Sequence, residues 1–323
     1  MPYQTGTAEG PNDLLYKIVE WLKALGWEEQ RAGLSGTDFI AHVSKNDMFV
    51  HMRTTMGNVT PWAHGHEGTS SSSQPAALHL YVGTGYSSGA NWNAQPGGPK
   101  GNNQTYTVGV AAQLNLEPIG LYGFYSDTED NICIVFEGRP GVISHIGWGR
   151  LDKVGVWTGG EYFFGALAGY AFRYTAAKTP GKDMHSDCPA AQNVHAAALV
   201  RADVDTFIGK WLGVGSSTYP ERGYTGMNAA SSVVGDGKPP VDIASYSGLD
   251  SRATNQAVLT AALLPVKLWA PRPGSGYSLL GDIPNVFFSS AANAPLSLQI
   301  GSVIKYGADE YALYPNFAVK RVP

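Results

Sequence analysis

The chain has few charged residues, few cysteines and no long hydrophobic segment. Asp, Glu, Lys and Arg make up 15% of its 323 residues, against about 25% in typical soluble domains. The net charge is -4, and the 22 Lys and Arg residues form no cluster that would bind nucleic acid. No apolar run approaches the ~20 residues of a membrane-spanning helix. The composition therefore argues against nucleic-acid and membrane partners.

The two cysteines, Cys133 and Cys188, give no disulfide framework. Cys133 lies in the apolar run 131–136, which is typical of a buried thiol, and we do not favour a bridge to Cys188. The first residues have neither the basic nor the apolar segment of a signal peptide. We therefore expect a protein that is made and folded in a cytoplasm.

Glycine and proline are abundant, with 40 and 20 residues, and this favours turns and short strands. The aromatic- and glycine-rich run from Pro118 to Ala166 alternates apolar stretches with turn residues, as consecutive strands do. We interpret this block as one that forms a surface. Further strands are predicted at residues 39–43, 48–52, 77–82, 266–269, 302–306 and 310–314.

One helix is predicted near the N-terminus. Asn12 is a suitable N-cap, and Gly26 is placed to end the helix. Glu20 and Lys23 fall on its exposed side. Apolar residues recur between these ends at three- and four-residue spacing: Leu14, Leu15, Ile18, Val19, Leu22 and Leu25. The sequence thus predicts a mainly β (α+β) fold, with antiparallel sheets, one amphipathic N-terminal helix and long loops.

The expected organisation is a helix-plus-sheet domain over residues 1–176 and a loop-rich β region over 177–323 that completes or packs on it. Three polar or glycine-rich segments, 55–76, 83–117 and 213–256, read as long loops. Long irregular segments on a rigid scaffold usually carry contacts. We expect these three loops to reach neighbouring subunits.

The segment GYSSG, residues 85–89, matches the nucleophile elbow G-x-S-x-G and follows a strand. The motif needs a helix directly after Ser87, but residues 90–98 are rich in Asn, Pro and Gly. The chain also lacks the strand–helix alternation of an α/β hydrolase. Residues 83–85 begin a dinucleotide fingerprint that lacks both its third glycine and its helix. We therefore interpret the segment as a glycine-serine loop.

Two polar groups resemble ligand sites. His64 and His66, at alternate positions beside Glu67, could reach one metal ion, although a solvated pair in a Ser- and Gly-rich loop is the simpler interpretation. Asp127, Glu129 and Asp130 could bind calcium or form a glycosidase pair, but that pair needs carboxyls ~5–10 Å apart across a cleft. We favour a solvated turn. Four histidines in strand-like runs are interpreted as structural: His42, His51, His79 and His145.

Six aromatic residues stand among glycines: Trp92, Trp148, Trp157, Tyr162, Phe163 and Phe164. They either fill a sheet-on-sheet core or face partners and sugars, and the sequence does not separate the two. For Trp92, in a loop, we favour an interface. Trp92→Ala is then expected to leave folding intact and to impair assembly.

Several segments resemble virion structural proteins of tailed bacteriophages. They are residues 80–86 (LYVGTGY), 91–98 (NWNAQPGG), 145–153 (HIGWGRLDK) and 158–162 (TGGEY), together with 12–15, 283–286 and 311–316. The resemblance implies a structural component of the tail, baseplate or neck that assembles with other virion proteins and with copies of itself in a symmetric oligomer. It implies no enzyme activity and no catalytic, cofactor or metal residue.

Two alternatives remain open from the sequence. A receptor-binding, lectin-like module of the same particle would use aromatic residues to stack sugars. A polysaccharide-degrading enzyme would need an acidic pair in a cleft, for which Asp127 and Asp130 are the candidates.

Overall fold

The computed structural model describes residues 3–56, 76–99, 109–114, 119–127, 130–139, 142–167, 196–203, 210–214, 229–232, 263–271, 277–289, 301–314 and 317–322. Within these ranges it confirms a mostly antiparallel β fold with a single α-helix near the N-terminus. The strands are β1 (Tyr3–Ala8), β2 (Glu28–Ser35), β3 (Asp38–Lys45), β4 (Met48–Thr55), β5 (Ala77–Gly83), β6 (Val110–Gln113), β7 (Ile119–Ser126), β8 (Ile132–Arg139), β9 (Val142–Arg150), β10 (Asp152–Lys153), β11 (Thr158–Leu167), β12 (Ala196–Asp203), β13 (Lys210–Val214), β14 (Ala229–Ser232), β15 (Leu263–Pro271), β16 (Tyr277–Ser289), β17 (Val303–Tyr306), β18 (Asp309–Leu313) and β19 (Phe317–Arg321). The helices are α1 (Pro11–Ala24) and the short 3-10 helix η1 (Trp92–Ala94).

The helix α1 begins earlier than predicted. Gly10 is its N-cap and Pro11 lies in the first turn, where the missing N–H of proline costs no hydrogen bond. Asn12 is therefore not the cap, and its side chain instead donates to the Thr37 carbonyl at 2.9 Å. Gly26 follows the helix at φ 83°, and this left-handed conformation explains the predicted stop.

Two arms of antiparallel sheet diverge from β11. One arm runs β2-β3-β4-β5-β6, and the other runs β1-β7-β8-β9. Both β9 and β6 pair with β11, at residues 161–164 and 166–167 respectively, while β12 pairs along the same stretch. Because a strand has two edges, β9 and β6 follow one another along the edge opposite β12. The arms therefore separate from a common line.

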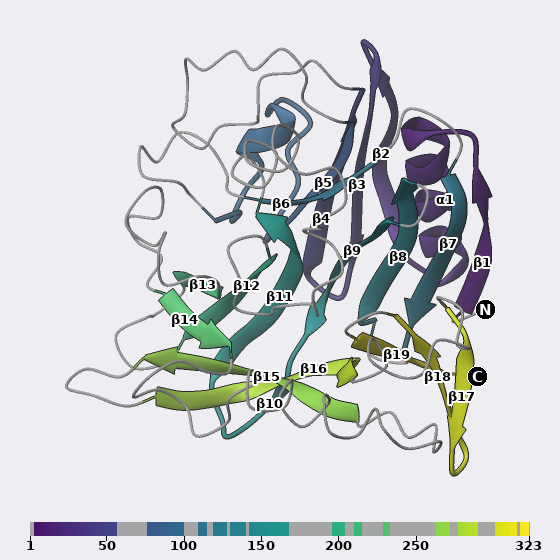
Figure 1. The fold of residues 1–323 in the computed structure, drawn as a ribbon. Coiled ribbons are helices and arrows are strands. Elements are labelled where there is room, and N and C mark those ends of the chain that lie inside the picture. The colour runs from purple at the N-terminus through teal and green to yellow at the C-terminus, as the bar shows by residue number, and fades with distance from the viewer. Residues whose placement is uncertain are drawn as a thin grey trace, which may run out of the picture.

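The helix α1 fills the wedge between the two arms (Figure 1). The Trp21 ring of α1 packs on the Phe124 ring of β7, with ring centroids 5.3 Å apart, and the Tyr16 ring of α1 contacts the Phe39 ring of β3 edge-on. The apolar positions predicted for the buried side of the helix are buried, and Leu25 is partly so. Burial on two sides, against both arms, stabilises a helix that would be marginal alone.

The strands β14-β15-β16-β19-β18-β17 form a further layer, which is joined to β13 through the parallel pair β13–β14. This layer covers the face of β7, β8, β9 and β11 that points away from α1. A second apolar core lies between these layers and includes Tyr125, Cys133, Tyr162, Phe164, Val266, Leu268, Ile283 and Phe317. The burial predicted for Cys133 is confirmed. Beyond residue 177, where the second of the two predicted regions begins, β12 and β13 continue the sheet of β11. The layers thus follow the order sheet, helix, sheet, sheet.

Glycines inside strands make room for aromatic rings. A Cβ atom on Gly123 would lie 2.8 Å from Cε2 of Tyr125, and one on Gly147 would overlap the ring of Phe164. The aromatic side chains of the run 118–166 are accordingly turned into the layers. Eight of them are buried: Tyr122, Phe124, Tyr125, Phe136, Trp148, Tyr162, Phe163 and Phe164. The block forms core, and our interpretation of it as a surface is wrong.

The predicted hairpins are present. Asn46 and Asp47 join β3 to β4 with φ of 48° and 62°, the conformation of a tight type I′ turn. The strand β14 lies inside the predicted loop 213–256, which β13 enters with its last two residues, and β6 lies inside the predicted loop 83–117. His64, His66, Glu67, Glu129 and Cys188 lie outside the described residues.

Candidate functional site

The sheet of β2 to β6 has one apolar and one polar face. The helix α1 lies against the apolar face, which carries Val43, Val50 and Leu80. The opposite face, which we call the polar face, carries Asp38, His42, His51, Arg53, Thr55, His79 and Tyr81. All of these except Arg53 are buried.

A row of four residues crosses the polar face. Arg31, His42, His51 and Tyr81 are neighbours on β2, β3, β4 and β5. The Nδ1 atoms of His42 and His51 are 2.7 Å apart, so one ring donates and the other accepts. Burial, with Arg31 nearby, lowers the pKa of His42 to about 4. Burial, with His42 nearby, lowers the pKa of His51 to about 3. Both rings are therefore neutral at pH 7.

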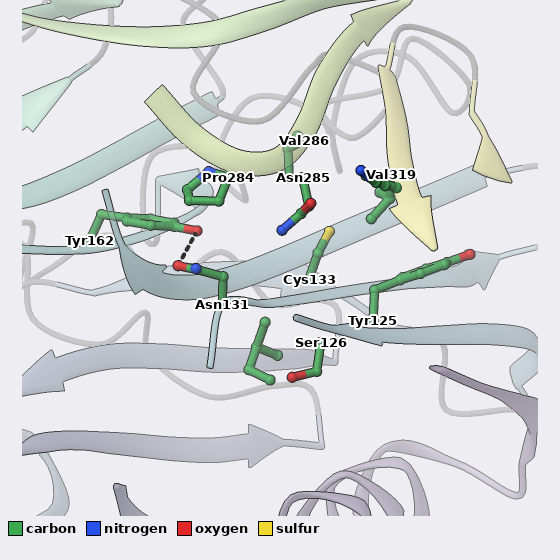
Figure 2. A pocket seen from close by; sticks show the side chains of 11 residues that line it. Tyr125, Ser126, Asn131, Cys133, Tyr162, Pro284, Asn285, Val286 and Val319 are labelled. Carbon is green, nitrogen blue, oxygen red and sulfur yellow. Dashed lines mark hydrogen bonds between the residues drawn. The ribbon is translucent and has the colours of Figure 1, made fainter. Parts of the chain in front are cut away.

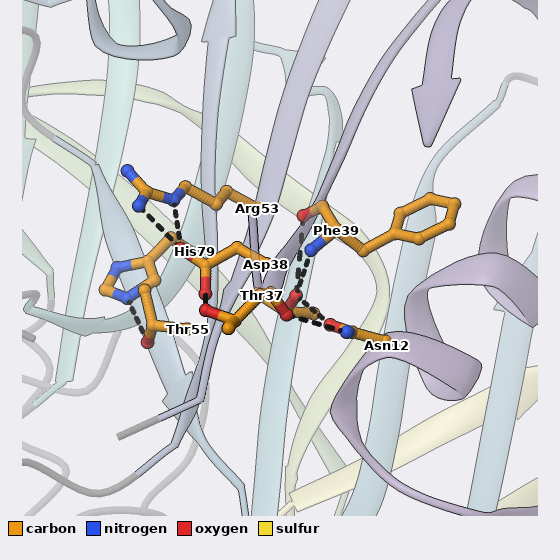
Figure 3. Close-up of polar contacts among 8 residues, drawn as sticks. Asn12, Thr37, Asp38, Phe39, Arg53, Thr55 and His79 are labelled. Carbon is orange, nitrogen blue, oxygen red and sulfur yellow. Dashed lines mark hydrogen bonds and ion pairs between the residues drawn. The ribbon is translucent and has the colours of Figure 1, made fainter. Parts of the chain in front are cut away.

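A second group lies further along β3 and β4 (Figure 3). Oδ2 of Asp38 accepts from Nε and Nη2 of Arg53 at 3.0 and 2.6 Å. Oγ1 of Thr55 lies 3.1 Å from Nε2 of His79. A hydroxyl beside an imidazole is the geometry of a nucleophile and its base, but both residues are buried. The nearby carboxylate, Asp38, is engaged by Arg53. This group is arranged to hold strands together.

The segment 84–99, which we call the flap, folds back over the polar face. Within it, η1 places Trp92 against Tyr81, with ring centroids 5.3 Å apart. The guanidinium of Arg53 lies 5.9 Å from the Trp92 ring centroid. Trp92 is 6% exposed, so our prediction of an interface tryptophan is wrong. The signal that was missed is the neighbouring Gln95, whose backbone amide donates to the Tyr81 hydroxyl at 3.3 Å and so holds the flap against β5.

The flap has its own hydrogen-bond centre in the side chain of Gln95. Its Oε1 accepts from the Ser87 amide at 2.7 Å, and its Nε2 donates to the carbonyls of Ser87 and Ala90 at 3.0 and 3.1 Å. Turns and then η1 follow Ser87, with no α-helix. Neither a nucleophile elbow nor a phosphate-binding helix terminus is formed, in agreement with the interpretation as a loop.

The carboxylates of the predicted acidic turn are structural links. Asp127 accepts from the Asn131 amide at 2.8 Å and from Nδ2 of Asn285 at 2.5 Å. Asp130 accepts from Nζ of Lys45 at 2.7 Å, and its side chain is largely buried. The two carboxylates therefore tie the β7–β8 turn to different elements. Both residues are partly exposed, so the turn is structural but less solvated than we expected.

Between these links lies a small cavity (Figure 2). The Tyr162 hydroxyl donates to Oδ1 of Asn131 at 3.2 Å, and Asn285 and Val286 of β16 face Cys133. The cavity volume is about 10 Å³, which is close to the least that one water occupies. A substrate does not fit there.

A wider hollow, of about 90 Å³, lies between the strands β1, β7, β8 and β9 and the residues Gly301 and Tyr314, which flank the β17–β18 hairpin. Its walls include Tyr3, Thr5, Tyr125, Ile143 and Tyr314. The hydroxyls of Tyr125 and Tyr314 are hydrogen-bonded to each other. Burial raises the pKa of both tyrosines above the ordinary value, so neither acts as a base at neutral pH.

The remaining candidates are also packed. His145 is buried between the rings of Phe164 and Phe317, with centroids 6.0 and 5.0 Å away. With it, the four histidines interpreted as structural are all buried, as predicted. Trp157 is partly buried against the second core.

No protein-family model matches the chain, and a search of curated proteins finds none similar to it. Among the described residues, no three His, Cys, Asp or Glu side chains are grouped so that they could hold a metal ion. No helix in the same residues is both long and apolar enough to cross a membrane.

Proposed function

We propose that the chain is a structural component of a tailed-phage virion, in the tail, baseplate or neck, and that it acts without catalysis. It assembles by protein–protein contacts with other virion proteins and with copies of itself. The observation that carries the proposal is how the described side chains are used. The described histidines and most of the described aromatic residues lie inside packed layers, whereas several large apolar residues are exposed at the ends of hairpins.

Three hairpins carry these exposed apolar residues. Leu34, near the end of β2, is 68% exposed, and Tyr306, at the end of β17, is 77% exposed. Val156, between β10 and β11, is fully exposed. Single exposed apolar residues are common on soluble proteins, but placement at hairpin ends leaves them free to insert into a neighbouring subunit. Among the described strands, β2 pairs only with β3 and β17 only with β18, so each also has a free edge.

The arrangement of these hairpins supports a symmetric assembly. The hairpins β2–β3 and β17–β18 project at opposite ends of the molecule (Figure 1). Contact surfaces at opposite ends suit head-to-tail association, which gives a closed ring when the rotation between copies closes.

The proposal is tested on purified particles of the phage whose genome carries this sequence. We expect the chain among the proteins of denatured particles, and gold-labelled antibody against the recombinant chain at one fixed position on intact particles. Absence of both the chain and the label would overturn the virion assignment.

The contact surfaces are tested on the recombinant chain by sedimentation. Leu34→Ser and Tyr306→Ser are expected to reduce self-association or binding to isolated tail structures. Tyr16→Ser, which removes a 51% exposed aromatic side chain from α1, is the control and is expected to have no effect. Equal behaviour of all three variants would contradict the role of the hairpins.

The receptor-binding alternative has one supporting observation, the tyrosine-walled hollow, because aromatic walls suit sugar rings. Binding of host-surface glycans by the wild-type chain, lost on Tyr314→Ala in a folded variant, would support it. Absence of binding at millimolar glycan would leave the assembly role alone.

A further inference from the structure

We propose that the paired His42 and His51 are a pH-sensitive clasp, and that proton uptake by this pair in acidic solution releases the flap from the polar face while the remaining layers stay folded. The inference concerns a conformational step and stands independently of a role in the virion.

The geometry of the pair defines what protons do to it. The 2.7 Å contact joins two Nδ1 atoms, and it needs one N–H and one lone pair. A first proton leaves that hydrogen bond in place but puts a charge in a buried site. A second proton gives both Nδ1 atoms a hydrogen, so the bond is lost and two like charges face each other. The closed arrangement is therefore compatible only with low proton occupancy.

The surroundings of the pair oppose a positive charge. A hydrogen bond between His51 and the Gly85 backbone favours the charged form of His51, but burial and the neighbouring His42 outweigh it. The titratable and charged groups that face it are Arg31 on β2, Asp38 on β3, Arg53 on β4, His79 and Tyr81 on β5, and Tyr86 on the flap. Asp38 is the one carboxylate among these described groups, and it is already paired with Arg53 at 2.6 Å. Arg31, the direct neighbour of His42, is positive. Protonation of the pair is thus opposed by what surrounds it.

The flap rests directly on the pair. The Tyr86 ring lies 5.0 Å from the His42 ring. The Thr84 amide donates to the Pro96 carbonyl at 3.0 Å, and this hydrogen bond joins the first residue of the flap to its far end, next to Gly83. A Cβ atom on Gly83 would lie 2.5 Å from that carbonyl oxygen and 3.0 Å from Nε2 of His51. A rearrangement of either ring therefore moves atoms that the flap touches.

The flap can leave as one piece, because its internal hydrogen bonds through Gln95 do not involve the sheet. Its attachments to the body are few. The Tyr81 hydroxyl donates to the Trp92 carbonyl and accepts from the Gln95 backbone amide at 3.3 Å. Nε1 of Trp211 donates to the Gly97 carbonyl at 2.9 Å, and His51 is hydrogen-bonded to the Gly85 backbone. Segments with few attachments open at lower free energy than the whole fold.

The size of the effect follows from linkage. In the closed state the two pKa values are depressed from 6.5 to about 4 and about 3, and in the open state they return towards 6.5. Protons therefore favour opening, and the closed state loses its advantage as the pH falls below 6.5. Between pH 7 and pH 5 the opening equilibrium rises about 20-fold per histidine, and several-hundred-fold for both.

The test is hydrogen–deuterium exchange of the full chain at pH 7 and pH 5, corrected for the intrinsic pH dependence of exchange. We expect protection of residues 84–99 to fall by at least about 100-fold, while protection of β7 and β8 stays unchanged. Protection of the flap that is equal at both pH values would overturn the proposal. Equal loss in the flap and in β7 and β8 would also overturn it, because the event would then be global unfolding.

Variants assign the effect to the pair. His42→Gln with His51→Gln is expected to abolish the pH dependence of flap protection, whereas His145→Gln, a buried histidine of another layer, is expected to retain it. Should the double variant not fold, the single variant His51→Gln is expected to reduce the change by about 20-fold. A change of wild-type size in either folded variant would contradict the clasp.

Discussion

Replacement of Trp92 distinguishes a core residue from an interface residue. The side chain is 6% exposed and packs on Tyr81 and Arg53. Burial of about 200 Å² of aromatic surface at about 25 cal/mol per Å² gives about 5 kcal/mol. Because the flap lies at the surface and can partly collapse into the space, we expect Trp92→Ala to reduce the free energy of unfolding by about 3 kcal/mol.

The assay is urea denaturation of the isolated chain followed by far-UV circular dichroism. Tyr306→Ala, which truncates an exposed aromatic residue, is the matched control and should change stability by less than about 0.5 kcal/mol. A Trp92→Ala variant as stable as the wild type would refute the packing described here and would restore the sequence-based prediction that this residue serves assembly alone.

Three further changes test other parts of the structure. Gly97 has φ 71°, and a Cβ atom there would overlap Thr84, whereas a Cβ atom on Gly89 would meet open space. In urea denaturation, Gly97→Ala should lower the free energy of unfolding by at least about 1 kcal/mol, and Gly89→Ala should leave it nearly unchanged. Burial raises the pKa of Glu161, but its hydrogen bond from Arg201 holds the pKa below the ordinary value. Glu161→Gln should therefore lower the free energy of unfolding by about 1–3 kcal/mol at pH 7, and this loss should shrink below pH 4.5, where Glu161 of the unfolded chain is protonated. Burial raises the pKa of the Cys133 thiol; in a variant without Cys188 it should react with a thiol reagent only after unfolding, and rapid reaction with the native chain would contradict its burial.

Elements whose signals are local were predictable. The helix α1 follows from the spacing of its leucines, and the β3–β4 hairpin follows from Asn46 and Asp47, which accept positive φ more readily than most residues. The strand β2 was missed because its sequence, EEQRAGLS, is polar. It pairs on one edge only among the described strands and is mostly exposed, so it has no apolar alternation to detect.

The polar face was only partly predictable. A two-residue turn at Asn46 and Asp47 fixes the register of the hairpin and places His42 opposite His51, so this pair was within reach of the sequence. The approach of Tyr81 and of the flap was not, because β5 is separated from β4 by a long segment whose length gives no register. Whether a loop tryptophan turns inward depends on that tertiary contact. Propensity carries no information about it.

The glycine content has a structural cause beyond turns. We interpreted glycine-rich stretches as turns and surface, since glycine is common in both. In the described strands, however, Gly6, Gly123 and Gly147 each leave space that an aromatic ring occupies. These rings belong to the two apolar cores, where they lie beside many aliphatic side chains, so glycine within these strands marks close packing and not exposure.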